Sequence, residues 1–191
     1  MTTTSPQGTQ ITGGTWAIDK NHSLIEFAAK HFDIAYVKGR FKNFSGTITV
    51  DEQDLLKSQV ELTIDATSLD SQAVQMREDL IKGEEMLEVD KYPEIKFRSR
   101  RIEQKDLANY VVHGDLTLRG ITKEVQIPVA FGGVVSTRMG MRAGFSGSLT
   151  INKSDFNVPF NREFEPGRHV VGDDIKVELQ VEAAPQQPAA A

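Results

Sequence analysis

Histidines close to carboxylates are the residues of this chain best suited to acid–base or metal chemistry. The four histidines are His22, His31, His113 and His169. Asp19 precedes the first of them by three residues, and Asp115 follows the third by two residues. A zinc site takes three or four protein ligands, so each pair alone falls short of one. We therefore expect these pairs to be solvated turn residues or structural hydrogen bonds.

Other catalytic and cofactor motifs are missing from the sequence. It contains no cysteine, which excludes a thiol nucleophile, a disulfide and Cys-ligated zinc. It has no Gly-rich phosphate loop, no Gly-x-Ser-x-Gly elbow and no His-Glu-x-x-His zinc pair. We expect no cofactor, no metal and no enzymatic activity. The alternative is an enzyme acting on a small apolar substrate, with His31 and Asp155 as its acid/base pair.

Charge and hydropathy restrict the classes of partner. The formal net charge is −5, which disfavours nucleic acid, because phosphate contacts require a positive surface. No stretch approaches the roughly 20 apolar residues of a membrane helix, and the polar N-terminus lacks a secretory signal. These features predict a cytoplasmic protein that is not embedded in a membrane, and they leave a homodimer open.

Most of the chain alternates between apolar and polar residues, which indicates strands with one buried face. In the last such segment Ile175, Val177, Leu179 and Val181 alternate with polar residues. The same pattern occurs at 25–31, 60–65 and 124–131, and further strands are predicted near 34–41, 44–50, 94–101, 109–118 and 141–151. Eight or nine antiparallel strands with mostly short connections predict a closed up-and-down barrel.

One segment has helical spacing instead. Leu69, Ala73, Met76 and Leu80 are four, three and four residues apart, which predicts a helical insertion near 70–88 with a stop at Gly83. The polar termini, 1–14 and 185–191, are expected to be disordered tails on a single domain over 15–184.

The enclosed face of such a barrel is apolar, because the charged face of each strand must lie in water. The chain has ten phenylalanines against three tyrosines and one tryptophan. A wall of phenylalanine and leucine suits a long apolar guest, since each buried methylene contributes about 0.8 kcal/mol. Simple filling of the core explains any single phenylalanine equally well.

Several short motifs follow one another in a specific order from about Thr15 to Ala184. They are Trp16-x-Ile18-Asp19-x-x-His22-Ser23, Phe27-x-x-x-His31, Val37-x-Gly39-x-Phe41-x-x-Phe44-x-Gly46, Tyr92-Pro93-x-Ile95-x-Phe97, Gly114-Asp115-Leu116-Thr117-Leu118-x-Gly120-Ile121-Thr122-Lys123, Ile151-Asn152-x-x-Asp155-Phe156 and Val171-Gly172-Asp173-x-Ile175. In this order and spacing they resemble the YceI-like family of polyisoprenoid-binding, lipocalin-fold proteins.

The resemblance implies an all-β fold with a single eight-stranded antiparallel, lipocalin-like barrel. It also implies a protein that binds, and carries or stores, an isoprenoid quinone, a polyprenyl phosphate or a fatty amide. The family has periplasmic and cytoplasmic members, and this chain resembles the cytoplasmic kind. Asp79 replaces the family's usual histidine, Met86 and Leu87 replace its aromatic residues, and Asn157 replaces a glycine. We therefore expect an altered entrance, and ligand identity does not carry over.

The residues expected to contact the ligand form two groups. Those predicted to surround its tail, or to pack beside it, are Phe27, Phe41, Leu80, Met86, Leu87, Phe97, Phe131, Phe145 and Phe156. Those predicted to lie near its polar head are His31, Arg40, Asp155 and Arg162, because an arginine suits a phosphate or a carbonyl.

Overall fold

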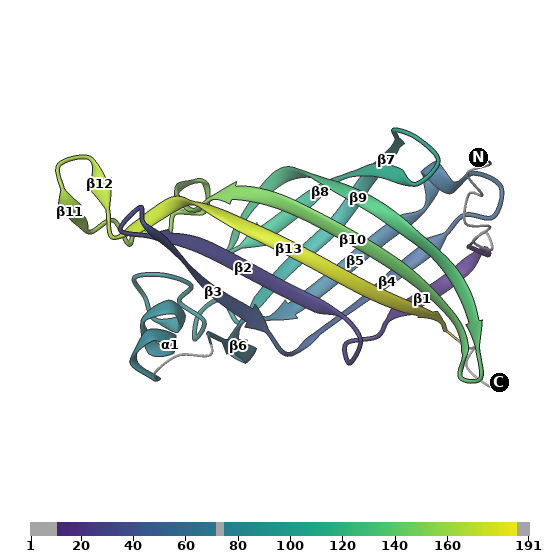
Figure 1. Cartoon of the computed structure of the whole chain (residues 1–191), viewed down its shortest axis with the longest axis horizontal. Coiled ribbons are helices and arrows are strands. Elements are labelled where there is room, and N and C mark those ends of the chain that lie inside the picture. Colours follow the sequence, from purple (N-terminus) through teal and green to yellow (C-terminus); the bar gives the residue numbers. More distant parts are fainter. Residues whose placement is uncertain (1–10, 72–74, 187–191) are drawn as a thin grey trace, which may run out of the picture.

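A computed structural model describes residues 11–71 and 75–186. These residues contain thirteen strands, one α-helix and three short 3-10 helices (Figure 1). The strands are β1 (Gly14–Ile18), β2 (Leu24–His31), β3 (Ala35–Phe41), β4 (Phe44–Val50), β5 (Gln59–Asp65), β6 (Leu69–Asp70), β7 (Glu94–Gln104), β8 (Asn109–Leu118), β9 (Ile121–Thr137), β10 (Gly140–Asn152), β11 (Glu163–Glu165), β12 (Arg168–His169) and β13 (Val171–Pro185). The helices are η1 (Leu55–Lys57), η2 (Ala66–Ser68), α1 (Gln75–Lys82) and η3 (Lys153–Phe156).

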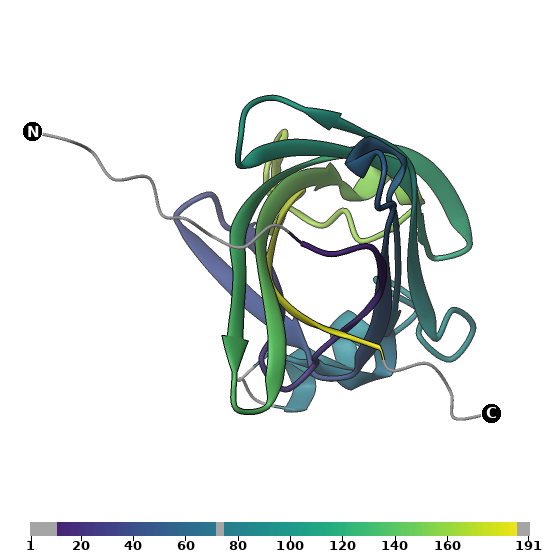
Figure 2. The same ribbon diagram turned by 90° about the vertical axis from the view of Figure 1, so that its right-hand side faces the viewer.

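Eight strands close into a ring, in the order β1–β4–β5–β7–β8–β9–β10–β13, and β13 pairs back to β1. The pairings around this ring are antiparallel. Figure 2 views the barrel from one end and shows the strands arranged around a central axis. The predicted all-β, eight-stranded antiparallel barrel is confirmed.

The long strand β13 receives two partners along one edge. β1 pairs with Ala183–Pro185, and β2 pairs with the stretch from Val171 to Gln180. β3 and the short β6 extend the sheet beyond β2. Two ends of the barrel follow from this arrangement (Figure 1). The α1 end carries α1, the β2–β3 turn and the β11–β12 hairpin, and the β9–β10 end carries the turn between those strands.

The predicted helix begins later than its spacing suggested. α1 starts at Gln75, whereas Leu69 lies in β6, pairs with Phe41 and is buried; Ala73 lies outside the described residues. Leu69 is in a strand because packing against the barrel core overrides the local helical spacing. Met76 is 77% exposed, so α1 does not bury the expected face. Gly83 does end the helix, and its N–H donates to the Asp79 carbonyl over 2.9 Å.

Buried side chains from distant parts of the chain fix the ring. Trp16 is 1% exposed and packs in a cluster with Ile48, Val134 and Ala183. Its indole N–H donates to the Thr12 carbonyl over 3.0 Å. This hydrogen bond satisfies the polar group of the side chain, which burial would otherwise leave without a partner. The cluster joins β1, β4, β9 and β13, and therefore locks the seam at which the barrel closes.

Candidate ligand-binding cavity

An apolar cavity of about 1270 Å³ runs inside the barrel. Leu80 and Met86 line it at the α1 end, and Leu55 and Leu107 line it towards the β9–β10 end. It therefore extends along most of the length of the barrel. A volume above the usual range for a drug-sized pocket indicates room for a large guest.

The wall is made by the inward face of each strand. On β13, Ile175, Val177, Leu179 and Val181 line the cavity, while the charged and polar residues between them are exposed. The predicted inward faces of 25–31, 60–65 and 124–131 line it as well. Successive side chains of a strand point to opposite faces, so these alternating segments enclose an apolar interior.

Two phenylalanines lie flat on the wall because glycines face them. A Cβ at Gly39 would lie 2.5 Å from the Phe27 ring, and one at Gly114 would lie 2.6 Å from the Phe97 ring. Gly39 is the register partner of Phe27 on β3. Only a residue without a side chain permits this approach. The rings therefore cover the sheet and leave the lumen open.

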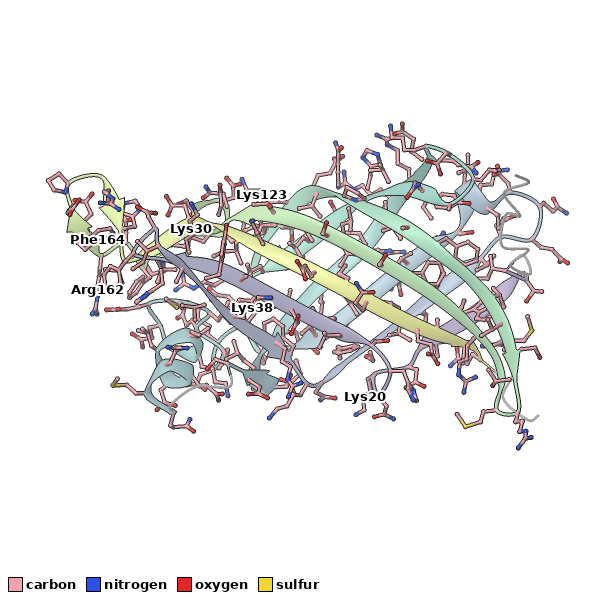
Figure 3. All side chains as sticks on the ribbon, in the orientation of Figure 1. Lys20, Lys30, Lys38, Lys123, Arg162 and Phe164 are labelled. Atoms are coloured by element: carbon pink, nitrogen blue, oxygen red, sulfur yellow. The ribbon has the colours of Figure 1, made fainter. Side chains whose placement is uncertain are left out.

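Ten of the residues predicted to contact a ligand line this one cavity. They are Phe27, His31, Phe41, Leu80, Met86, Leu87, Phe97, Phe131, Phe145 and Arg162. The ring centroids of Phe27 and Phe41 are 5.6 Å apart, and those of Phe131 and Phe145 are 5.2 Å apart. Figure 3 places Arg162 beside Phe164 at the α1 end. Contact between these residues and a ligand stays a prediction.

Three other predicted residues are not part of the lining. Arg40 has the opposite parity to Phe41 on β3 and binds Asp70 over 3.1 Å on the outside. Asp155 is exposed in η3. Phe156 is 1% exposed and packs within a core cluster rather than on the lumen. Local backbone geometry explains why these three side chains do not line the cavity. The alternation of β3 turns Arg40 outward, and the 3-10 helix η3 interrupts the alternation at 155–156.

The alternative acid/base pair is not assembled. In the described part of the chain no hydrogen bond or ion pair joins His31 to Asp155. His31 packs edge-on against Phe32, with ring centroids 4.2 Å apart. A general base needs a partner within hydrogen-bond reach, and this geometry does not supply Asp155 as that partner.

The loop after Asp155 retains a conformation that favours glycine. Asn157 has φ +51° and caps η3, and its N–H donates to the Ser154 carbonyl over 3.1 Å. Asparagine is among the few residues that adopt the left-handed region readily. The replacement of the family glycine therefore leaves this turn intact.

Of the two histidine–carboxylate pairs, one forms and the other does not. The His22 Nδ1 lies 2.9 Å from the Asp19 carboxylate, and this hydrogen bond lowers the pKa of Asp19 and raises the pKa of His22. Glu182 completes a cluster whose donor atoms lie within 4.8 Å of one another. However, the Arg142 guanidinium binds Glu182 over 3.2 Å. The positive charge next to this cluster is therefore supplied by an arginine side chain of the protein itself.

His113 contacts different residues from those expected. It is 3% exposed, with its Nε2 3.3 Å from the Glu103 carboxylate and its Nδ1 3.1 Å from the Arg101 guanidinium. Asp115 binds Arg100 over 2.8 Å instead. This histidine is held between strands β7 and β8 outside the cavity.

Sequence reasoning missed five charged residues of the lining, Glu26, Lys30, Arg77, Lys96 and Lys153, and Lys153 is the buried one among them. It is 5% exposed, lines the cavity and forms an ion pair with Asp173. Inward parity is the signal that could have revealed it, because Leu149 and Ile151 precede it at two-residue spacing.

Within the described ranges, no helix is both long and apolar enough to cross a membrane.

Comparisons with known proteins match nearly the whole barrel. The family model of the YceI-like domain matches residues 16–183. A UPF0312 protein of Vibrio parahaemolyticus is 36% identical over 139 residues, which are 72% of this chain and 73% of that protein.

Solved structures show the same fold. Burkholderia cenocepacia BcnA superposes with a TM-score of 0.77 at 25% identity, covering 87% of this chain and 99% of that one. The Campylobacter jejuni YCEI protein superposes with a TM-score of 0.71 at 28% identity, covering 83% and 90%. A polyisoprenoid binding domain from Saccharophagus degradans superposes with a TM-score of 0.67 at 15% identity, covering 90% and 98%.

Proposed function

The chain belongs to the YceI-like family, and from that premise we propose that it binds an apolar, isoprenoid-type lipid inside its barrel and carries or stores it. The observation that carries this proposal is the lumen itself, an apolar cavity of about 1270 Å³ with the inward faces of its strands as walls. Such a cavity binds by removing apolar surface from water, and it needs no catalytic group to do so.

The size of the lumen sets the size of the guest. A water-sized atom occupies about 30 Å³ in a liquid, so a cavity of 1270 Å³ holds about 40 non-hydrogen atoms. An isoprene unit has five carbons, and the lumen therefore suits a tail of about eight units. Shorter fatty chains would leave much of the wall without contact.

The comparisons support the same ligand class only through the fold. The S. degradans structure is described as a polyisoprenoid binding domain, and it shares the barrel at 15% identity. We infer binding rather than catalysis because His31 and Asp155 do not meet.

The direct test is to extract the purified protein with organic solvent and identify apolar molecules by mass spectrometry. Purification without detergent keeps an endogenous ligand in place. We expect a lipid with a tail of about 30 to 40 carbons, on the volume per atom used above. The delipidated protein should then take up an added polyprenol of similar length. Protein that releases no apolar molecule and binds no added lipid would refute the proposal.

A further inference from the structure

Lys153 is the buried charge of the cavity wall. The buried polar or charged residues of the described ranges are Ser58, Ser71, His113 and Lys153. Of these, Ser58 and Lys153 line the cavity, and only Lys153 carries a fixed charge. Burying an ammonium group costs free energy unless it is paired. The other charged residues of the lining are not buried, so a buried lysine in a predominantly apolar wall requires an explanation.

The register of β10 and β13 turns this lysine inward. Ile151 pairs with Ile175, and both line the cavity. Lys153 follows Ile151 by two residues, and Asp173 precedes Ile175 by two residues. Because β10 and β13 are antiparallel, these two positions lie beside each other. Their side chains form an ion pair, and Lys153 lines the cavity. This layer of the wall therefore contains a charged side chain, whereas the layer of Ile151 and Ile175 is apolar.

Hydrogen-bond capacity remains on the ammonium group. A lysine Nζ has three N–H donors, and one of them is used by the Asp173 carboxylate. For residues 11–71 and 75–186 no second protein acceptor is assigned to the Lys153 Nζ. Two donors can therefore serve a guest at this end of the lumen.

The charge of Lys153 is already balanced by its surroundings. Asp173 neutralises it, and the other oxygen of that carboxylate lies 3.5 Å from His169 Nδ1. Arg162 is paired with Glu85 over 2.8 Å, and Lys96 is paired with Glu94 over 2.7 Å. Lys30 and Arg77 also line the cavity, but both are exposed to water. A phosphate would bring negative charge next to the Asp173 carboxylate, whereas a neutral acceptor oxygen adds none.

We propose that Lys153 fixes the polar head of the bound lipid at the α1 end by donating a hydrogen bond to a neutral carbonyl oxygen. This inference rests on the proposed function and makes it specific: Lys153 selects tails that end in a carbonyl head and sets the direction in which they enter. At the β9–β10 end the polar lining residues are uncharged, among them Ser58, Gln104 and Tyr110, so the head is held more strongly at the α1 end.

The test compares three probes that share one prenyl tail: a prenylated quinone, a polyprenyl phosphate and the hydrocarbon without a head. The wild-type protein should bind the quinone about tenfold to a hundredfold more tightly than the hydrocarbon, which is the effect of one hydrogen bond from a charged donor. Lys153→Met should remove most of this preference, and Lys153→Arg should restore part of it. Lys38→Met, on the exposed face of β3 and labelled in Figure 3, is the matched control and should retain the preference.

Two further measurements separate a binding role from a structural one. The infrared carbonyl band of the bound quinone should move to lower frequency in the wild type and return towards its free value in Lys153→Met. The double variant Lys153→Met/Asp173→Asn avoids leaving a buried carboxylate unpaired and should lose the preference to the same extent. If that double variant folds and still prefers the quinone, Lys153 does not hold the head.

The remaining outcomes also decide the matter. A phosphate probe that binds more tightly than the quinone, with a preference that depends on Lys153, would overturn the neutral head. Binding of all three probes with equal affinity would overturn the head site while leaving the lipid-binding proposal intact. Binding of none of them would overturn the proposed function itself.

Discussion

Replacing Leu179 with tryptophan should divide the lumen into two shorter compartments. Leu179 lies near the middle of β13 and lines the cavity. Its register partners are Gly147 on β10 and Ile25 on β2. Because Gly147 has no side chain, an indole ring at position 179 has space beside it to extend across the lumen.

The expected effect follows from the dimensions of the barrel. The 15 residues of β13 span about 46 Å at about 3.3 Å per residue, or about 35 Å along the axis of a barrel with strands tilted by about 40°. The cavity volume of 1270 Å³ divided by that length gives a cross-section of about 36 Å², which is about one chain wide. A plug at the midpoint would exclude about 20 of the roughly 40 atoms of a full tail. At about 0.3 kcal/mol per atom the loss is about 6 kcal/mol, or roughly four orders of magnitude in Kd.

A competition titration with polyprenols of about 20 and about 40 carbons measures this loss. The wild-type protein should prefer the longer chain strongly, and Leu179→Trp should bind the two almost equally. Glu178→Trp places the same ring on the exposed face of the same strand and should keep the wild-type preference. If folded Leu179→Trp binds the longer chain as tightly as the wild type, the tail does not lie in the lumen.

Three further predictions concern the barrel itself. Trp16→Ala should lower the free energy of unfolding by about 3–5 kcal/mol, measured by urea denaturation, because the residue is 1% exposed at the seam of the ring; a change below 1 kcal/mol would contradict its role there. Gly114→Ala should cost about 1–3 kcal/mol, since its Cβ would lie 2.4 Å from a backbone oxygen, whereas Gly144→Ala, whose Cβ meets nothing within 4 Å, should cost much less; equal losses would contradict the steric explanation. The hydrogen bond between Asp19 and His22 lowers the first pKa from 3.8 and raises the second from 6.5. Its contribution should therefore be complete between those two values, and it should decline as pH falls through the lowered pKa or rises through the raised one. The urea midpoint of Asp19→Asn should differ from that of the wild type most near the middle of this window, and a difference independent of pH would exclude the ion pair as its cause.

Period-two alternation was enough to predict the barrel. In the segment ending at Val181 the apolar residues are two apart, and a strand has only two faces, so the pattern determines both the element and its buried side. The start of α1 could not be predicted in the same way. Leu69 fits a helical face with Met76, but its burial against Phe41 depends on a strand that is distant in sequence. Local spacing contains no information about such a partner.

The same reasoning explains which of the predicted site residues line the cavity. Phe27 and His31 share parity with Ile25 and line the lumen with it. Arg40 was selected for its charge rather than its parity, and it lies outside because Phe41 points inward. Phe156 is the last residue of the 3-10 helix η3, and within such a turn the inward or outward direction of a side chain no longer follows the two-residue alternation of a strand.

Specificity in this barrel depends on departures from its regular pattern. A wall that follows the alternation without exception presents only apolar groups, and it can distinguish guests by length and width alone. The register that places Ile151 opposite Ile175 also brings Lys153, which lines the cavity, beside Asp173. A lone charge would be costly there, so a polar group can enter the wall only as a balanced pair. The ion pair between these two residues meets that requirement, and it gives one end of an apolar lumen a donor with which a head group can be recognised.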